Sequence, residues 1–276
     1  MGYLLGSIAG GLVYERFDSQ LTLALFCAIM AAFQAVIPWN KTVPGLAATL
    51  FVLSFGGGGL DAAGNVWLLH MWGKSSAPFM QALHFTFGLG AFIAPLIAEP
   101  FLSNKVNVTI SAEEVELLPN DENMLFWWPY AIISGLGVVT AISLVVMYFV
   151  KSSDKPHPSI LDRQSLTQLT LKQKIIILSL ASMIFHCYCG LEIAFGRFMT
   201  SFVFYSDLHL SKSIGAYMTS VFWGTFTFCR LLSVFVVDFV GSKTMIFIDL
   251  FIILIGNVLL FIFGKLTLLI IKQFTF

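Results

Sequence analysis

The amino-acid sequence predicts an all-α polytopic membrane protein, and three observations carry this prediction. First, 58% of the residues are hydrophobic and only 11% are charged, whereas a soluble domain is about half apolar and about a quarter charged. Second, the apolar residues gather in runs close to the ~20 residues that a helix needs to cross a bilayer. Third, short polar stretches separate these runs, and several of them contain proline or glycine.

Eight apolar runs qualify as candidate spans, and a ninth begins near Leu266. The breaks between runs carry turn-forming residues, such as Pro38 and Pro44 after the second run and Gly241 after the seventh. The first run is shorter than the others. The predicted spans are Met1–Tyr14, Leu21–Ile37, Gly45–Met71, Ala77–Phe101, Leu125–Val150, Ile175–Val203, Ile214–Val237 and Thr244–Phe263.

The loops between these runs carry unequal numbers of basic residues, which predicts the orientation of the chain. If successive loops alternate sides, eight Lys or Arg residues fall on the side of Arg16 and four on the other. Cytoplasmic loops carry the excess of Lys and Arg, so we expect the side of Arg16 to be cytoplasmic. The acidic loop after the fourth run then lies outside, and its sequon at Asn107 predicts a glycosylation site. We expect a multi-pass protein of the plasma membrane.

Two loop motifs indicate a repeat. The first run ends in residues 11–16 (GLVYER), and the seventh ends in residues 238–243 (DFVGSK). Each resembles part of the Gly-x-x-x-Asp/Glu-Arg-x-Gly-x-Lys/Arg loop of the major facilitator superfamily, the first matching its front and the second its back. A carboxylate at such a helix end can pair with the opposing bundle and close the cytoplasmic side. Candidate gate residues are therefore Glu15, Arg16 and Asp238; the alternative is ordinary charge at a helix end.

The repeat also predicts the domain organisation. It makes the first run equivalent to the second helix of a twelve-helix fold, so the eight spans correspond to helices 2–9 of a partial major facilitator fold. We expect an N-terminal bundle at residues 1–150 without its first helix and the start of a truncated C-terminal bundle at 175–276. Residues 151–174 between them have the Lys, Pro, Ser and Asp content of a cytoplasmic linker.

Asp61 is the first candidate functional residue. Placing an ionisable side chain inside a membrane span costs free energy, so such a residue is a candidate for a functional role. It follows the run Gly56–Gly59, whose lack of side chains lets a neighbouring helix or a ligand approach the backbone. Asn65 lies four residues on and therefore points the same way. Asp61 could carry a coupling proton, bind a cation, or only bond a neighbouring helix.

Polar residues in the fourth run predict sugar recognition. Gln81, His84 and Gly88 share one stripe at helical spacing. Amide and imidazole groups can hydrogen-bond the hydroxyl groups of a sugar. The alternative is that both side chains make helix–helix hydrogen bonds.

The last three candidates lie in the sixth and seventh runs. Arg230 stands in an apolar stretch and needs an acidic partner, for which Glu192 and Asp238 are the local candidates. It could contact substrate, or it could form a structural ion pair. Trp223 could stack on the face of a sugar ring or fill the bundle core.

Several function classes are excluded. The formal net charge is zero, which does not fit nucleic-acid binding. The sequence has no Ser/His/Asp order, no His-x-x-x-His pair and no phosphate-binding glycine loop, so we expect no enzyme activity. The four cysteines lie in apolar runs without the spacing of a metal site and are interpreted as packing residues. We expect no metal and no cofactor other than a coupling ion.

The sequence resembles the fucose–galactose–glucose symporter branch of the facilitator superfamily, and most closely the sodium-dependent glucose transporter 1 group. The stretches that carry the resemblance are Gly64–Gly73 (GNVWLLHMWG), Ala77–Phe85 (APFMQALHF), Gly90–Leu96 (GAFIAPL), 190–196 (GLEIAFG) and 222–224 (FWG) with Arg230. In the fucose permease of this branch, an acidic residue at the position of Asp61 takes part in proton coupling. The resemblance implies a sugar carrier.

We therefore expect a secondary active transporter of a hexose, coupled to Na⁺ or H⁺, that works by alternating access between two bundles. The expected partners are a small-molecule sugar and the lipid bilayer. The alternative is a truncated membrane protein that does not transport.

Overall fold

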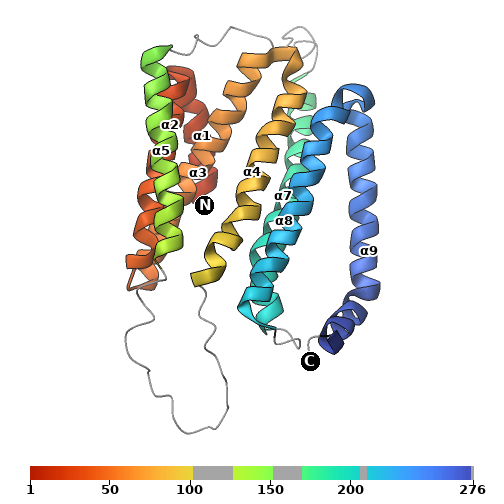
Figure 1. The fold of residues 1–276 in the computed structure, drawn as a ribbon. Helices are drawn as coiled ribbons and strands as arrows, with labels where there is room; N and C mark the ends of the chain where they lie inside the picture. Colours follow the sequence, from red (N-terminus) through yellow and green to blue (C-terminus); the bar gives the residue numbers. More distant parts are fainter. Residues whose placement is uncertain (102–126, 152–169, 206–209, 275–276) are drawn as a thin grey trace. The chain divides into compact units, whose positions relative to one another are not determined.

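The computed structural model describes residues 1–101, 127–151, 170–205 and 210–274, and all secondary structure in these ranges is helical. This confirms the predicted all-α class. The elements, shown in Figure 1, are α1 (Gly2–Arg16), α2 (Ser19–Val36), η1 (Ile37–Trp39), α3 (Val43–Trp72), η2 (Gly73–Ser75), α4 (Ser76–Ala98), η3 (Glu99–Phe101), α5 (Trp128–Val150), α7 (Leu171–Tyr205), α8 (Lys212–Val240) and α9 (Ser242–Phe274).

Short polar residues set where the helices begin and end. Asp18 caps α2 by accepting hydrogen bonds from the backbone N–H groups of Gln20 (2.8 Å) and Leu21 (3.3 Å). Ser211 caps α8 in the same way. Gly241 follows α8 with φ 75°, a left-handed conformation that glycine adopts without a steric cost. Gly241 therefore ends α8 at a position where the sequence predicts a turn.

Five stretches of the described chain are long and apolar enough to cross a membrane. One of them, Val43–Phe101, contains both α3 and α4, while α1 has only 15 residues. The membrane-spanning character of the chain is thus supported by its helices. The predicted number of eight spans is not confirmed by this criterion and stays a prediction.

The chain divides into two compact units, each with its own packing. The first comprises Met1–Ser76 and Lys105–Leu161, in which α1 packs on α3 while α2 packs on both α3 and α5 (Figure 1). The outward side chains of α5 are apolar and exposed, for instance Leu136 at 60% and Val139 at 62%. Such a face is stable against lipid rather than water.

The contact between α1 and α3 depends on glycine. Gly2, Gly6 and Gly10 recur every fourth residue and face α3, so they form one stripe along α1. A Cβ added at Gly6 would collide with the carbonyl oxygen of Phe55, and one at Gly10 would come within 2.6 Å of the carbonyl oxygen of Gly59. The two backbones therefore touch directly, which is how small residues hold membrane helices together.

The second unit comprises Ala77–Asn104 and Asp162–Phe276, and its described helices are α4, α7, α8 and α9. Helix α7 packs along α8, and α4 meets α8 through small residues. A Cβ on Gly88 of α4 would lie 2.6 Å from the Thr227 hydroxyl oxygen of α8, and Gly224 of α8 makes room for the ring of Phe92. Helix α4 is thus grouped with later helices, although it stands between α3 and α5 in the chain.

The predicted domain boundaries at residues 150 and 175 stay a prediction. The central part of the predicted linker, residues 152–169, lies outside the described residues.

Candidate functional site

The first candidate group lies on α3, in the first unit, where Asp61 accepts hydrogen bonds at both carboxylate oxygens. The Tyr3 hydroxyl of α1 donates to Oδ2 at 2.6 Å. The Asn65 side-chain amide donates to Oδ1 at 3.1 Å and to the Asp61 carbonyl oxygen at 2.9 Å. Asp61 and Asn65 therefore share a face, as their spacing predicts.

This group has the chemistry of a site for a small cation. Both partners of the Asp61 carboxylate in the described part of the chain are neutral, so its negative charge is not cancelled by a basic side chain. The amide oxygen of Asn65 is buried and accepts no hydrogen bond from the described residues. A carboxylate whose hydrogen-bond partners are neutral can bind a hard cation such as Na⁺, which prefers oxygen ligands. Tyr3 was not predicted from the sequence, because no spacing relates it to Asp61.

The second candidate group centres on Arg230 of α8, in the second unit. One guanidinium nitrogen donates to the Gln81 side-chain oxygen of α4 at 3.0 Å, and another donates to the Tyr188 hydroxyl of α7 at 3.1 Å. The guanidinium also lies over the ring of Phe226, 5.0 Å from its centroid. Arg230 thus joins three helices, and two of the predicted site residues, Gln81 and Arg230, touch.

Two carboxyl groups of the same unit, on α7 and α9, interact electrostatically with this arginine, and neither accepts a hydrogen bond from it in the described part of the chain. Glu192 lies one helical turn after Tyr188 on α7 and interacts electrostatically with Arg230. Asp249 of α9 interacts electrostatically with the same arginine. Glu192 was a predicted acidic partner of Arg230; the side chain of the other, Asp238, lies outside the described residues. Asp249 was missed, although an acid inside the predicted eighth span is itself a signal.

Trp223 has the surroundings of a packed core side chain. It is 8% exposed and meets the rings of Phe87 (5.8 Å between centroids) and Phe226 (5.5 Å) edge to face. A Cβ on Gly196 would lie 2.6 Å from its indole ring. These contacts favour the bundle-core alternative over stacking on a sugar. His84 is half-buried on α4, one turn from Gln81.

The predicted gate residues stand at helix ends. Glu15 and Arg16 are exposed in the last turn of α1. The buried neighbour Tyr14 instead turns toward α3, where its hydroxyl hydrogen-bonds the Nδ1 atom of His70 at 2.9 Å. The gate stays a prediction, and so does the glycosylation site, because Asn107 lies outside the described residues.

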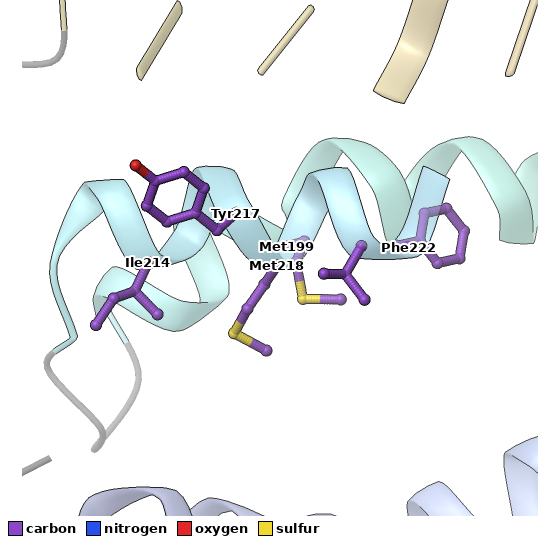
Figure 2. A pocket seen from close by; sticks show the side chains of 6 residues that line it. Met199, Ile214, Tyr217, Met218 and Phe222 are labelled. Carbon is purple, nitrogen blue, oxygen red and sulfur yellow. The ribbon is translucent and has the colours of Figure 1, made fainter. Parts of the chain in front are cut away.

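A cavity of about 380 Å³ opens beside α7 and α8, near the C-terminal end of α7 and the N-terminal end of α8. Figure 2 shows its lining side chains, among which the Tyr217 hydroxyl is the one polar group. An apolar pocket of this kind does not supply the several hydrogen bonds that sugar hydroxyls require. The lining residues are Met199, Ile214, Tyr217, Met218, Val221 and Phe222.

The chain is similar to known proteins along most of its length. Residues 1–274 match the family profile of the Major Facilitator Superfamily. The chain is 31% identical over 281 residues to the human protein named sodium-dependent glucose transporter 1, covering 96% of this chain and 53% of the human protein. It is 32% identical over 263 residues to sodium-dependent glucose transporter 1A of Mus musculus, covering 89% of this chain and 60% of the mouse protein.

A shorter stretch is similar to another human protein. The chain is 43% identical over 102 residues to major facilitator superfamily domain-containing protein 4A, covering 36% of this chain and 20% of that protein. No solved structure matches. The chain spans about half the length of the human glucose transporter that it matches.

Proposed function

Because the chain belongs to the Major Facilitator Superfamily, we propose that it acts in the secondary active transport of a hexose, driven by Na⁺ or H⁺ through alternating access. Members of this superfamily are integral membrane transporters built from related helical bundles that bind substrate near the middle of the membrane. The names of the human and mouse relatives support glucose as the substrate class and sodium as a coupling ion.

The Asp61 group is the observation that carries this proposal. A carboxylate within a membrane helix is costly to keep. Here its two hydrogen-bond partners, Tyr3 and Asn65, orient it without neutralising it. Binding of a proton or cation would cancel the charge, and a change of charge inside the membrane can bias one conformation over another. Asp61 is therefore our proposed coupling residue, with Asn65 as the residue that orients its carboxylate.

The proposed sugar contacts come from α4. Gln81 and His84 are half-buried polar residues on one stripe of this helix. The Gln81 side-chain oxygen already accepts a hydrogen bond from Arg230, so its NH₂ group is the part available to a sugar hydroxyl.

The proposal is tested by reconstituting the chain in liposomes and measuring uptake of labelled glucose under an inward Na⁺ or H⁺ gradient. We expect saturable uptake that the gradient drives, with the effective ion identifying the coupling partner. Asp61→Asn should abolish accumulation against a gradient and leave part of the sugar exchange at equilibrium, because binding of the sugar does not need the charge. Accumulation at the wild-type level in Asp61→Asn would refute the coupling role.

A matched control is Thr140→Ala on α5, since the Thr140 hydroxyl is exposed and bonds only its own helix, at the Leu136 carbonyl. It should transport like the wild type. If neither protein shows saturable uptake although both are folded, the alternative of a non-transporting membrane protein is favoured.

A further inference from the structure

The guanidinium group of Arg230 is held in one orientation by its contacts in the second unit. One nitrogen donates to the Tyr188 hydroxyl of α7 at 3.1 Å. The planar group also lies over the Phe226 ring, 5.0 Å from the ring centroid. Rotation of the guanidinium would break this hydrogen bond or take the charge off the ring face. Its other bonded nitrogen is thereby directed to α4, where it donates to the Gln81 side-chain oxygen at 3.0 Å.

The chemistry of arginine decides which end of the Gln81 amide faces it. A guanidinium group carries five N–H donors and no acceptor, so only the amide oxygen, and not the NH₂ group, can lie against it. The NH₂ group is then turned away from Arg230. Gln81 is half-buried, and no described residue accepts a hydrogen bond from this NH₂ group. The amide therefore offers two unused donors, while the arginine engages its oxygen.

We propose that Arg230 is a positioning residue for substrate recognition: through Gln81 it presents a hydrogen-bond donor, and not an acceptor, to one hydroxyl group of the sugar. This inference rests on the proposed sugar transport, and the sugar hydroxyl acts as the acceptor in it. Without Arg230, the Gln81 amide could turn over and offer either its oxygen or its NH₂ group, because this terminal torsion is nearly two-fold. The arginine thus narrows the hydrogen bonds that the site can make, which is a source of specificity.

Two other roles of Arg230 lead to different behaviour. If the guanidinium itself bound the sugar, its replacement would weaken binding even in a chain that already lacks the Gln81 amide. If Arg230 only joined α4, α7 and α8, its replacement would lower stability without changing which sugar analogues are preferred. Affinities for a set of analogues therefore separate the three roles.

The test measures equilibrium binding of glucose analogues to the purified chain in lipid nanodiscs by isothermal titration calorimetry, which does not require transport. In the analogues, one hydroxyl group of glucose at a time is replaced by hydrogen or by fluorine. Fluorine accepts a weak hydrogen bond and donates none, whereas hydrogen does neither. For the wild type, we expect one ring position at which the fluoro sugar binds about threefold more tightly than the deoxy sugar, the effect of one weak hydrogen bond.

Two variants should remove this preference. In Gln81→Glu, the carboxylate pairs with Arg230 but offers no donor, so the fluoro and deoxy sugars should bind equally. In Arg230→Met, the amide is no longer held, and the preference should fall although Gln81 is unchanged. The matched control is Ser233→Ala on α8, since this hydroxyl bonds the Cys229 carbonyl of its own helix at 2.9 Å. It should keep the wild-type preference.

Equal binding of the fluoro and deoxy sugars at every position of the wild type would overturn the proposal, as would the full preference in Arg230→Met. Added to Gln81→Leu, the Arg230→Met change should cause no further loss of glucose affinity, and a further loss would assign Arg230 a direct sugar contact instead. If Arg230→Met does not fold, Tyr188→Phe replaces it, because it removes a contact that holds the guanidinium. An unchanged preference in Tyr188→Phe would then overturn the proposal.

The same measurements distinguish this inference from the transport proposal. The expected binding pattern in a chain that shows no ion-driven glucose uptake would contradict coupled transport and leave the positioning role in place. Uptake without any fluoro preference would do the reverse. A folded wild-type chain that binds none of these sugars would contradict both.

Discussion

Arg230 illustrates how a charged side chain is accommodated within a membrane protein. Its guanidinium divides its hydrogen bonds between an amide oxygen on α4 and a hydroxyl group on α7, and its flat face rests on the Phe226 ring. The fixed fork of donors and the planar, weakly hydrated charge suit arginine to this position. A lysine has one nitrogen and could not reach both Gln81 and Tyr188 in the same geometry.

We therefore expect Arg230→Lys to lower the free energy of unfolding of the chain by about 1–3 kcal/mol, the range for losing a hydrogen bond to a charged group. Thermal denaturation of the purified protein in nanodiscs measures this change. The double variant with Gln81→Leu should lose less than the sum of the two single variants, because both changes remove the same contact. Additive losses would show that the Arg230–Gln81 hydrogen bond does not contribute.

At the scale of helices, close packing depends on where glycine occurs rather than on how much of it there is. Gly6 and Gly11 both lie on α1, but only Gly6 faces the backbone of α3. On α4, Gly88 faces α8, whereas a Cβ on Gly90 would meet nothing within 4 Å. These pairs separate the intrinsic effect of glycine on a helix from its effect on packing.

Gly6→Ala should destabilise the first unit by about 1–3 kcal/mol or more, since the new methyl group forces α1 away from α3. Gly11→Ala should be neutral or should stabilise the chain by up to about 1 kcal/mol, because alanine favours a helix. Thermal denaturation of the two variants under the same conditions compares them. Equal effects would mean that the α1–α3 contact does not need glycine at position 6.

The same comparison applies to the contact between α4 and α8. Gly88→Ala would bring a methyl group within 2.6 Å of the Thr227 hydroxyl oxygen and 2.8 Å of the Phe226 ring, so we expect a loss of about 1–3 kcal/mol. Gly90→Ala should cost nothing. A Gly88→Ala protein as stable as the wild type would indicate that α4 and α8 can accommodate the added methyl group without loss of packing.

At the scale of the whole molecule, orientation is decided by charge outside the bilayer. The excess of Lys and Arg in alternate loops predicts that the side of Arg16 faces the cytoplasm and that the acidic loop Leu102–Met124 faces outward. That loop lies outside the described residues, so its position stays a prediction.

We expect Asn107 in this loop to carry a glycan when the chain is made in animal cells. Glycosidase treatment should then increase the electrophoretic mobility of the wild type and leave Asn107→Gln unchanged. Protease added to sealed cells should cut within residues 102–124. Protection of this segment from external protease would reverse the predicted topology.

Properties that depend on neighbouring residues in the chain were determined by the sequence alone. Apolar runs and turn residues located the helices, and four-residue spacing placed Asp61 and Asn65 on one face, because helix periodicity is a local property. The number of spans was harder to predict, since α1 has only 15 residues and the apolar stretch Val43–Phe101 holds two helices. Helix boundaries and span boundaries are set by different physical requirements, hydrogen bonding in one case and bilayer thickness in the other.

Only the tertiary structure decided which helices meet and which side chains they bring together. The sequence analysis predicted Glu192 and Asp238 as acidic partners of Arg230. It could not show that Asp249 on α9 interacts with Arg230 on α8, so Asp249 was not predicted. The Gly6 contact with α3 and the Tyr3 hydrogen bond to Asp61 were missed for the same reason. Contacts between helices depend on how their faces are rotated toward one another, and this rotation is fixed by packing across the whole unit.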